Sequence, residues 1–238
     1  MNLRDQLGKQ SKVLYIFDYD GTLTPIVEQR NEAILTADQV SAINQVHANE
    51  NSAVAIVSGR GLNNLQELID QAPAKLDHSI LIIGSHGAEI TGQELELDFS
   101  EALNSLAKSL EQKFDELDLE TKKLSLAVHY RGHPDPKTLV NELKKIAQDY
   151  QDQFRIQEGL LVFEFVPKEI NKSLAINFLH EQYPEHYLVY FGDDYTDCFA
   201  FDRINELGGL SVQIDERIES SARSKIESVA ALYSELLT

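Results

Sequence analysis

Two aspartates, Asp18 and Asp20, stand directly behind an unbroken apolar run in this chain of 238 residues. The run, residues 13–17, has the length and the β-branched and aromatic content of a strand buried on both faces. In an extended backbone, residues two apart point the same way, and Gly21 lets the chain turn tightly behind them. Two like charges held that close require a cation. The alternative is an ordinary turn at the end of a strand, where Asp and Gly are common.

The cation that this pattern favours is Mg²⁺, a hard ion that takes oxygen ligands and often bridges to a phosphate. One carboxylate can then attack phosphorus to give an aspartyl-phosphate, while its neighbour serves as general acid and base. A calcium EF-hand loop is excluded, because Gly21 comes too early and Gln29 stands where the loop needs Glu. The spacing therefore predicts a centre for phosphoryl transfer.

The composition narrows the classes of partner. An apolar fraction of 42% is ordinary for a globular protein, and the length suits one large domain or a core with an insertion. A net charge of -18 argues against nucleic acid and against anionic membranes. A single cysteine, Cys198, fits a reducing compartment, and no signal-peptide or membrane segment is evident. We expect a cytoplasmic protein with a small-molecule substrate and no obligate protein partner.

Apolar runs alternate with helical spacings in both terminal parts of the chain. We expect further buried strands at residues 53–57, 79–83, 187–191 and, as the last strand, 210–214. We expect helices at residues 36–50, 62–70, 171–182, 197–204 and 226–237. Strands that alternate with helices predict an α/β fold with a parallel sheet flanked by helices.

The middle of the chain has a different texture, rich in charge. Helices are expected near residues 101–117 and 137–148, and strand-like stretches lie at 124–131 and 156–167. These predict an inserted α+β domain at residues 93–167, with one face of its sheet left open, between core segments 1–92 and 168–238.

Alternation along the predicted strands places polar side chains on that open face. His129 and Arg131 point to the same side, and Glu164 is a lone acid in an apolar strand. Such groups can bind sugar hydroxyls. The alternatives are a histidine satisfied within the sheet and an arginine at the exposed end of a strand.

Further polar residues follow the other predicted strands, at the edge where ligands bind in open α/β sheets. Ser58 can hold a phosphoryl oxygen together with N–H groups of the next helix, or it can cap that helix. Lys172 opens a helix, where an anionic ligand would offset its unfavourable position; a solvated surface lysine is the alternative. Asp193 and Asp194 add a second acidic pair, which strengthens the case for a metal. Asp197 can simply stabilise a helix N-terminus.

Taken together, the motifs DYDGTLTP, SGR, NKS and GDDYTD, in this order, resemble those of the haloacid dehalogenase superfamily of Mg²⁺-dependent phosphotransferases. A narrower resemblance is to the trehalose 6-phosphate phosphatases. It is carried by SHGAE at 85–89, HYR at 129–131, Glu164 with Pro167, and LGGLSV at 207–212. The resemblance covers nearly the whole chain and implies a Rossmann-like core with an inserted α+β cap.

The resemblance also implies roles for the acidic residues. Asp18 would be the nucleophile and a metal ligand. Asp20 would be the general acid and base and would bind Mg²⁺ through its backbone carbonyl. Asp193 would be the remaining protein ligand, with Asp194 and Asp197 supporting it through water or hydrogen bonds.

Binding roles are implied in the same way. The transferred phosphoryl group would be held by Ser58, Gly59 and Lys172, and Lys172 would also restrain the nucleophile. The residues expected to bind the rest of the substrate are Arg60, His86, Glu89, His129, Arg131 and Glu164.

The implied activity is hydrolysis of trehalose 6-phosphate to trehalose and phosphate. The alternatives are a phosphatase for sucrose 6-phosphate or for a glucosyl- or mannosyl-glycerate phosphate, and a phosphomutase that returns the phosphoryl group to a sugar. A silent metal or sugar sensor is disfavoured, because every group that the chemistry requires is present. Ser173 and Cys198 depart from the usual family pattern, which bears on fine substrate preference.

Overall fold

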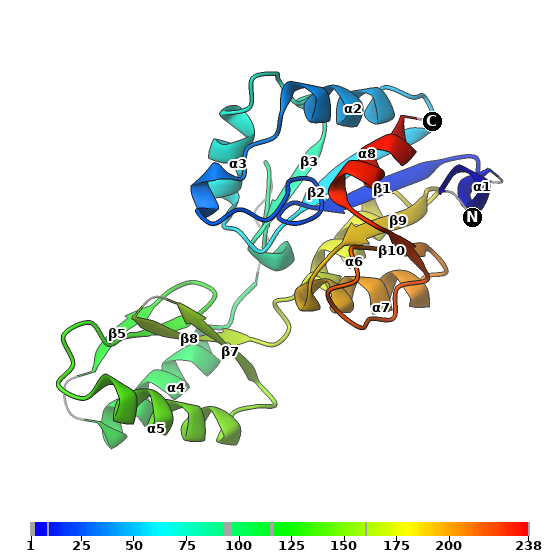
Figure 1. The fold of residues 1–238 in the computed structure, drawn as a ribbon. Coiled ribbons are helices and arrows are strands. Elements are labelled where there is room, and N and C mark those ends of the chain that lie inside the picture. The colour runs from blue at the N-terminus through cyan, green and yellow to red at the C-terminus, as the bar shows by residue number, and fades with distance from the viewer. Residues whose placement is uncertain (1–2, 9, 93–96, 115–116, 160, 238) are drawn as a thin grey trace. The chain divides into compact units, whose positions relative to one another are not determined.

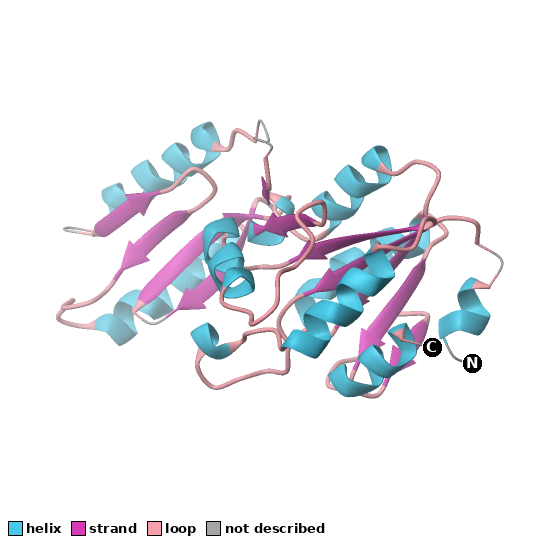
Figure 2. Cartoon of the chain, turned by 90° about the horizontal axis from the view of Figure 1, so that it is seen from above, coloured by secondary structure: helices cyan, strands magenta, loops and turns pink. Residues whose placement is uncertain are grey.

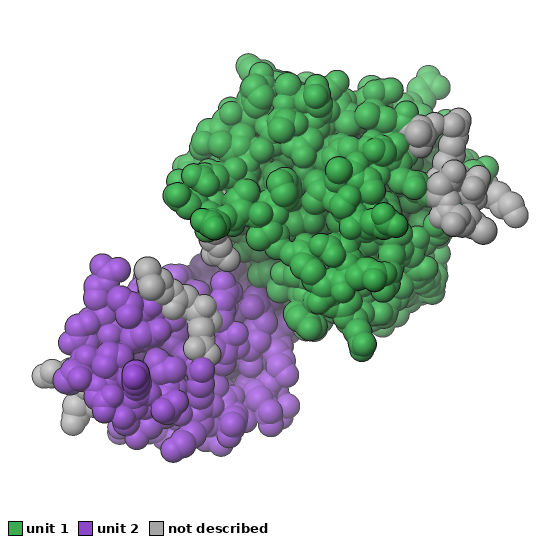
Figure 3. Space-filling view, in the orientation of Figure 1, with its two compact units in different colours: residues 1–95, 171–238 green, residues 96–170 purple. Residues whose placement is uncertain are grey.

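The computed structural model describes residues 3–8, 10–92, 97–114, 117–159 and 161–237. The chain divides into two compact units, Met1–Leu95 with Asn171–Thr238 and, between them, Glu96–Ile170 (Figure 3). Each unit has its own sheet and its own helices, coloured by type in Figure 2. That the smaller unit acts as a cap for a catalytic core stays a prediction.

A seven-stranded sheet lies in the middle of the larger unit, in the order β11-β10-β9-β1-β2-β3-β4. Neighbouring strands run parallel, except that β4 is antiparallel to β3. The strands are β1 (Val13–Asp18), β2 (Ser52–Val57), β3 (Leu81–Gly84), β4 (Glu89–Ile90), β9 (Tyr187–Gly192), β10 (Leu210–Ile214) and β11 (Ser224–Ile226). The predicted α/β fold is confirmed. The prediction that β10 is the last strand is wrong, because the short β11 extends the sheet beyond it.

Helices cover both faces of this sheet (Figure 1). One face packs against α1 (Leu3–Leu7), α2 (Ala37–His47), α3 (Leu62–Asp70) and α8 (Val229–Leu236), and the other against α6 (Ser173–Gln182) and α7 (Cys198–Glu206). Thr36 begins α2 with a capping box that it forms with Gln39. The unit also contains the 3₁₀ turns η1 (Arg30–Glu32), η2 (Ser85–Gly87) and η3 (Tyr195–Asp197). No helix among the described residues has the length and apolar character needed to cross a membrane.

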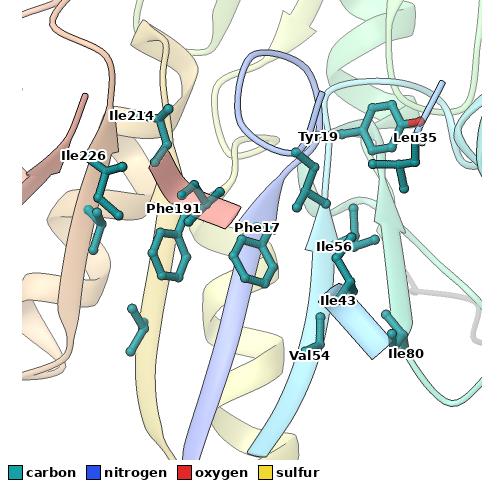
Figure 4. Close-up of a cluster of buried hydrophobic side chains, with 14 of the residues drawn as sticks. Phe17, Tyr19, Leu35, Ile43, Val54, Ile56, Ile80, Phe191, Ile214 and Ile226 are labelled. Atoms are coloured by element: carbon teal, nitrogen blue, oxygen red, sulfur yellow. The ribbon is translucent and has the colours of Figure 1, made fainter. Parts of the chain in front are cut away.

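Aromatic packing fixes the two central strands to each other. Phe17 of β1 stacks on Phe191 of β9, with ring centroids 4.7 Å apart, and both rings are fully buried (Figure 4). Stacked aromatic pairs contribute about 0.5–1.5 kcal/mol beyond the area that they bury. This pair therefore holds the carboxyl ends of β1 and β9 level with each other.

The smaller unit is an antiparallel sheet with helices on one face. Its strand order is β5-β6-β8-β7, and the strands are β5 (Asp118–Thr121), β6 (Leu126–His129), β7 (Phe154–Gly159) and β8 (Val162–Pro167). The helices α4 (Ser100–Lys113) and α5 (Pro136–Asp149) pack with leucine and phenylalanine side chains of the sheet in one apolar core. The other face carries polar side chains and is called the open face below.

Candidate active site

Strand register brings the predicted site residues to one edge of the larger sheet. Asp18, the last residue of β1, lies level with Val57 of β2, so that Ser58 follows at the same edge. Phe17 lies level with Phe191 of β9, so that Asp193 also follows there. All three strands are parallel and end together, as expected for a ligand site in an open α/β sheet.

Three buried carboxylates gather at this edge and are called the carboxylate cluster. Asp18, Asp193 and Asp197 are 4%, 1% and 0% exposed, and each offers an oxygen within 4.8 Å of the others. Burial raises the pKa of Asp18 well above its ordinary range, and although Lys172 opposes this, the other two carboxylates add to it. The site therefore favours a further cation.

Lys172 is the buried cation of the cluster. It is 2% exposed and donates hydrogen bonds of 2.6 Å to Oδ1 of Asp18 and to Oδ1 of Asp197. Burial lowers its pKa, but the two carboxylates raise it further, so the net shift is upward. The alternative of a solvated surface lysine is wrong. Lys172 lies directly before α6, and its side chain points inward to Asp18 at the end of β1.

Asp197 is the most heavily bonded member of the cluster. Its Oδ1 accepts from Lys172 and from the hydroxyl of Tyr190, each at 2.6 Å. Its Oδ2 accepts from the backbone N–H groups of Asp193 and Asp194, at 2.9 and 3.0 Å. Four donors fill its acceptor capacity. Asp197 therefore orients the loop after β9, a larger role than support of a helix N-terminus.

Asp193 has two described side-chain partners, and sequence reasoning singled out neither. Thr22 donates to its Oδ1 at 3.1 Å, and Arg217 donates to its Oδ2 at 2.7 Å. Burial and the nearby Asp197 nevertheless raise the pKa of Asp193 to about 6. Arg217 follows β10, whose carboxyl end lies beside that of β9, and this adjacency is the signal that would have found it.

Two glycines leave room for these carboxylates. A Cβ placed on Gly21 would lie 2.3 Å from Oδ2 of Asp193, and one on Gly192 would lie 2.3 Å from Cγ of Asp197. Gly21 also has a φ of +85°, which residues with a side chain rarely adopt. The backbone at both positions therefore lies too close to a carboxylate to carry a side chain without a shift of that carboxylate.

The carboxylate of Asp20 lies apart from the cluster. Its two oxygens accept from Nε and Nη2 of Arg60, each at 2.6 Å. Strand β1 ends at Asp18, and Asp20 lies in the following turn. The group of carboxylates that could hold a metal contains Asp18 but not Asp20, and a cation shared by their two side chains stays a prediction. A ligand role for the Asp20 backbone carbonyl stays a prediction.

Ser58 and its neighbours form a tightly bonded rim. Ser58 is 1% exposed, and its Oγ accepts from the backbone N–H of Arg60 at 3.1 Å. The ring of His86, whose φ is +56°, lies so close to Gly59 that a Cβ there would be 2.5 Å from it. Oε2 of Glu89 accepts from the first N–H of α3, that of Leu62, at 2.7 Å.

Glu89 also accepts from Ser85 Oγ at 2.8 Å and so caps α3 from outside the helix. The Asp194 carboxylate likewise accepts from the backbone N–H and the hydroxyl of Thr196. Both acids therefore support local backbone. Substrate contacts by Arg60, His86 and Glu89 stay predictions.

The open face of the smaller unit holds a second, more exposed group of charges. Oε1 of Glu164 accepts from Ser125 at 2.6 Å and from Lys122 at 3.0 Å. His129 lies 2.9 Å from Glu120 through its Nε2. Glu164 is level with Ala127 between Ser125 and His129, so these side chains share one face. Arg131 lies exposed beyond the end of β6.

The carboxylate cluster fits a divalent metal through its chemistry. Lys172 donates to Oδ1 of Asp18. The other oxygen, Oδ2, accepts no hydrogen bond within the part of the chain that the structure describes. Asp193 supplies a second buried carboxylate, and hard cations favour such oxygen donors. Asp197 fits less well as a ligand, because four donors already hold it.

The fold is of the haloacid dehalogenase type, and the comparisons with known proteins identify the family. The trehalose-phosphatase family profile matches residues 16–234, and the chain belongs to that family. The solved trehalose-6-phosphate phosphatase of Aspergillus fumigatus superposes with a TM-score of 0.73 at 22% identity, covering 99% of this chain and 95% of that one.

Two known proteins are also similar to this chain in sequence. The trehalose-6-phosphate phosphatase of Escherichia coli K12 is 27% identical over 86% of this chain and 78% of its own. The alpha,alpha-trehalose-phosphate synthase [UDP-forming] B of Dictyostelium discoideum is 23% identical over 99% of this chain. The chain spans only 31% of the length of that protein.

Proposed function

We propose that this protein is a Mg²⁺-dependent phosphatase that hydrolyses trehalose 6-phosphate to trehalose and phosphate. The observation that carries the proposal is the buried cluster of Asp18, Asp193 and Asp197 with Lys172, at the carboxyl edge of the sheet. Trehalose 6-phosphate is proposed as the substrate because the chain belongs to the trehalose-phosphatase family.

Each residue has a role in the proposed reaction. Oδ2 of Asp18 attacks phosphorus while Lys172 holds Oδ1, and the alcohol of the sugar departs. Asp20 gives the leaving oxygen its proton and then takes one from the water that hydrolyses the aspartyl-phosphate. Arg60, which holds the Asp20 carboxylate, releases it for each transfer.

Asp18, Asp193 and the backbone carbonyl of Asp20 would hold the metal. Bound there, Mg²⁺ neutralises charge on the phosphoryl group and positions it for in-line attack. Ser58, Gly59 and Lys172 hold the phosphoryl oxygens. Asp194 and Asp197 keep the loop after β9 in place through the hydrogen bonds described above.

The smaller unit, residues 96–170, is proposed to act as a cap that reads the sugar. Glu164, His129 and Arg131 are its proposed ligands for sugar hydroxyls. The bonds from Ser125 and Lys122 to Glu164 support this, because they fix a charged acceptor on a face that is otherwise exposed.

Phosphate release from a panel of sugar phosphates tests the proposal. Metal-free protein should be inactive and Mg²⁺ should restore turnover, with trehalose 6-phosphate giving the highest kcat/KM. Preference for sucrose 6-phosphate or a glycosyl-glycerate phosphate would retain the phosphatase and replace the substrate. Transfer of phosphate to a second sugar instead of water would indicate a mutase. Full activity after EDTA treatment would overturn the metal site.

A further inference from the structure

Arg217 is a charged side chain that the proposed reaction does not use, although it contacts a proposed metal ligand. Its Nη2 donates to the buried Oδ2 of Asp193 at 2.7 Å. Its own side chain is 40% exposed, whereas that of Asp193 is 1% exposed. The arginine therefore reaches from the surface into the carboxylate cluster.

The loop after β10 is built to hold Arg217 in this place. Gln213, fully buried, donates to the carbonyls of Asp215 and Ile218 at 3.0 and 2.9 Å and so clamps both sides of the loop. Ile218 is buried, which anchors the loop. Asp215 has a φ of +67°, and its carboxylate accepts from the backbone N–H of Glu216.

Asp215 is a second carboxylate partner of Arg217. Oδ2 of Asp215 lies 3.3 Å from Nε of Arg217, and the Asp215 side chain is 48% exposed. The guanidinium thus has a buried partner, Asp193, and an exposed partner, Asp215. A shift of the long side chain toward solvent keeps the second contact while it frees the first.

The charges in the carboxylate cluster and on Arg217 determine how Arg217 affects metal binding. When all three carboxylates of the cluster are ionised, their three negative charges face the two positive charges of Lys172 and Arg217. A divalent cation entering beside Arg217 meets like charge and finds an oxygen of Asp193 already bonded. Removal of the arginine leaves that oxygen free and the site more negative.

We propose that Arg217 is a tethered cation that competes with the divalent metal for Asp193. It neutralises the buried carboxylate when metal is absent and moves toward Asp215 when metal binds. Arg217 is thus a positioning residue that sets the metal affinity of the site. The inference rests on the proposed metal site and goes beyond it.

Calorimetric titration of metal-free protein with Mn²⁺ tests the proposal. Arg217→Gln should bind Mn²⁺ about 10- to 100-fold more tightly than the wild type, the scale of a charged hydrogen bond to a buried group. Arg217→Lys keeps the charge and should stay near the wild type. Asp215→Asn removes the exposed partner and should weaken binding by about 2- to 5-fold, the scale of a half-exposed ion pair.

Arg223 provides a matched control on the same loop. It donates to the backbone carbonyls of Gly209 and Asn205, at 3.1 and 3.0 Å, so Arg223→Gln makes the same change in net charge away from the cluster. Its melting temperature should fall while its Mn²⁺ affinity stays at the wild-type value. Arg217→Gln should also melt lower without metal but gain more from saturating Mn²⁺.

The outcomes separate the inference from the proposed function. Unchanged or weaker Mn²⁺ binding by Arg217→Gln, with wild-type binding intact, would overturn the competition and leave the metal site standing. Equal tightening by Arg217→Gln and Arg223→Gln would reduce the effect to net charge and also overturn it. A wild-type protein that binds no Mn²⁺ would overturn both the metal site and this inference.

Discussion

The carboxylate cluster and the open face both set acids against cations, but they differ in burial. In the cluster, Lys172 and Asp197 have side chains that are 2% and 0% exposed. On the open face, Lys122 and Glu164 are 43% and 18% exposed. A buried charge that loses its partner is strongly destabilising, whereas exposed pairs contribute little. Fold stability should therefore depend on the pair of Lys172 and Asp197 in the cluster, whereas charges on the open face can be altered with little effect on stability.

Replacement of the nucleophile should have the largest effect on activity. Asp18→Asn removes the attacking oxygen and a negative metal ligand, so phosphate release should fall to background. The metal-free variant should melt at or above the wild-type temperature, because burial and the neighbouring carboxylates already disfavour the charged form of Asp18. Calorimetry in EDTA checks this. A large fall in melting temperature would show that the pair with Lys172 outweighs the repulsion.

Removal of the most heavily bonded acid should have the largest effect on stability. Asp197→Ala leaves Lys172 with one described carboxylate partner and frees two backbone N–H groups, at a cost of about 3–5 kcal/mol of unfolding free energy. Asp194→Ala, in the same turn, loses the hydrogen bonds from Thr196 and an attraction to Lys172 through a more exposed carboxylate, and should cost about 0.5–2 kcal/mol. Denaturant unfolding of both variants measures the difference. Equal losses would contradict the contrast in burial.

On the open face, activity and stability should separate. Glu164→Gln should lower kcat/KM for trehalose 6-phosphate by about 10- to 1,000-fold, the scale of a charged hydrogen bond plus partial misorientation. Hydrolysis of a small aryl phosphate, which lacks the sugar, should barely change. Parallel loss on both substrates with a lower melting temperature would make Glu164 structural. No change on either would place sugar recognition elsewhere.

The smallest effect is expected at the exposed partner of His129. Glu120→Gln keeps a hydrogen-bond acceptor for the ring and changes an exposed pair, so unfolding free energy should shift by at most about 0.5 kcal/mol. Its kcat/KM should fall less than that of Glu164→Gln. Urea melts and the same two substrates measure both quantities. A loss as large as that of Glu164→Gln would show that His129 depends on this pair.

Sequence patterns predicted the fold well where local signals agree with long-range packing. The run before Asp18 became the central strand, and the helical spacing at residues 36–50 became α2, which Thr36 caps. The strand at residues 224–226 gave no such signal, because a segment of three residues is too short to show a period. It exists because β10 offers an edge to pair with.

The sequence predicted which residues form the site better than it predicted which of them pair with each other. An extended backbone was assumed through Asp20, but the chain turns after Asp18, and Arg60 takes the second carboxylate. For Asp197 the sequence shows only an acid near the start of a helix. The bonds from Lys172 and Tyr190 come from segments distant in sequence or on another element, and spacing carries no information about them.

The glycines at the cluster have a consequence for sequence variation. Since any Cβ at Gly21 or Gly192 would overlap a carboxylate, variants at these two positions can persist only if the acid moves away. In a library that samples every amino acid at each position and selects for phosphatase activity, both should tolerate replacement as poorly as Asp18. At Gly208, where nothing lies within 4 Å of an added Cβ but φ is +78°, replacement strains only the backbone and should be tolerated better. Intolerance of replacement at these two glycines would thus identify the site as clearly as intolerance at its acidic residues.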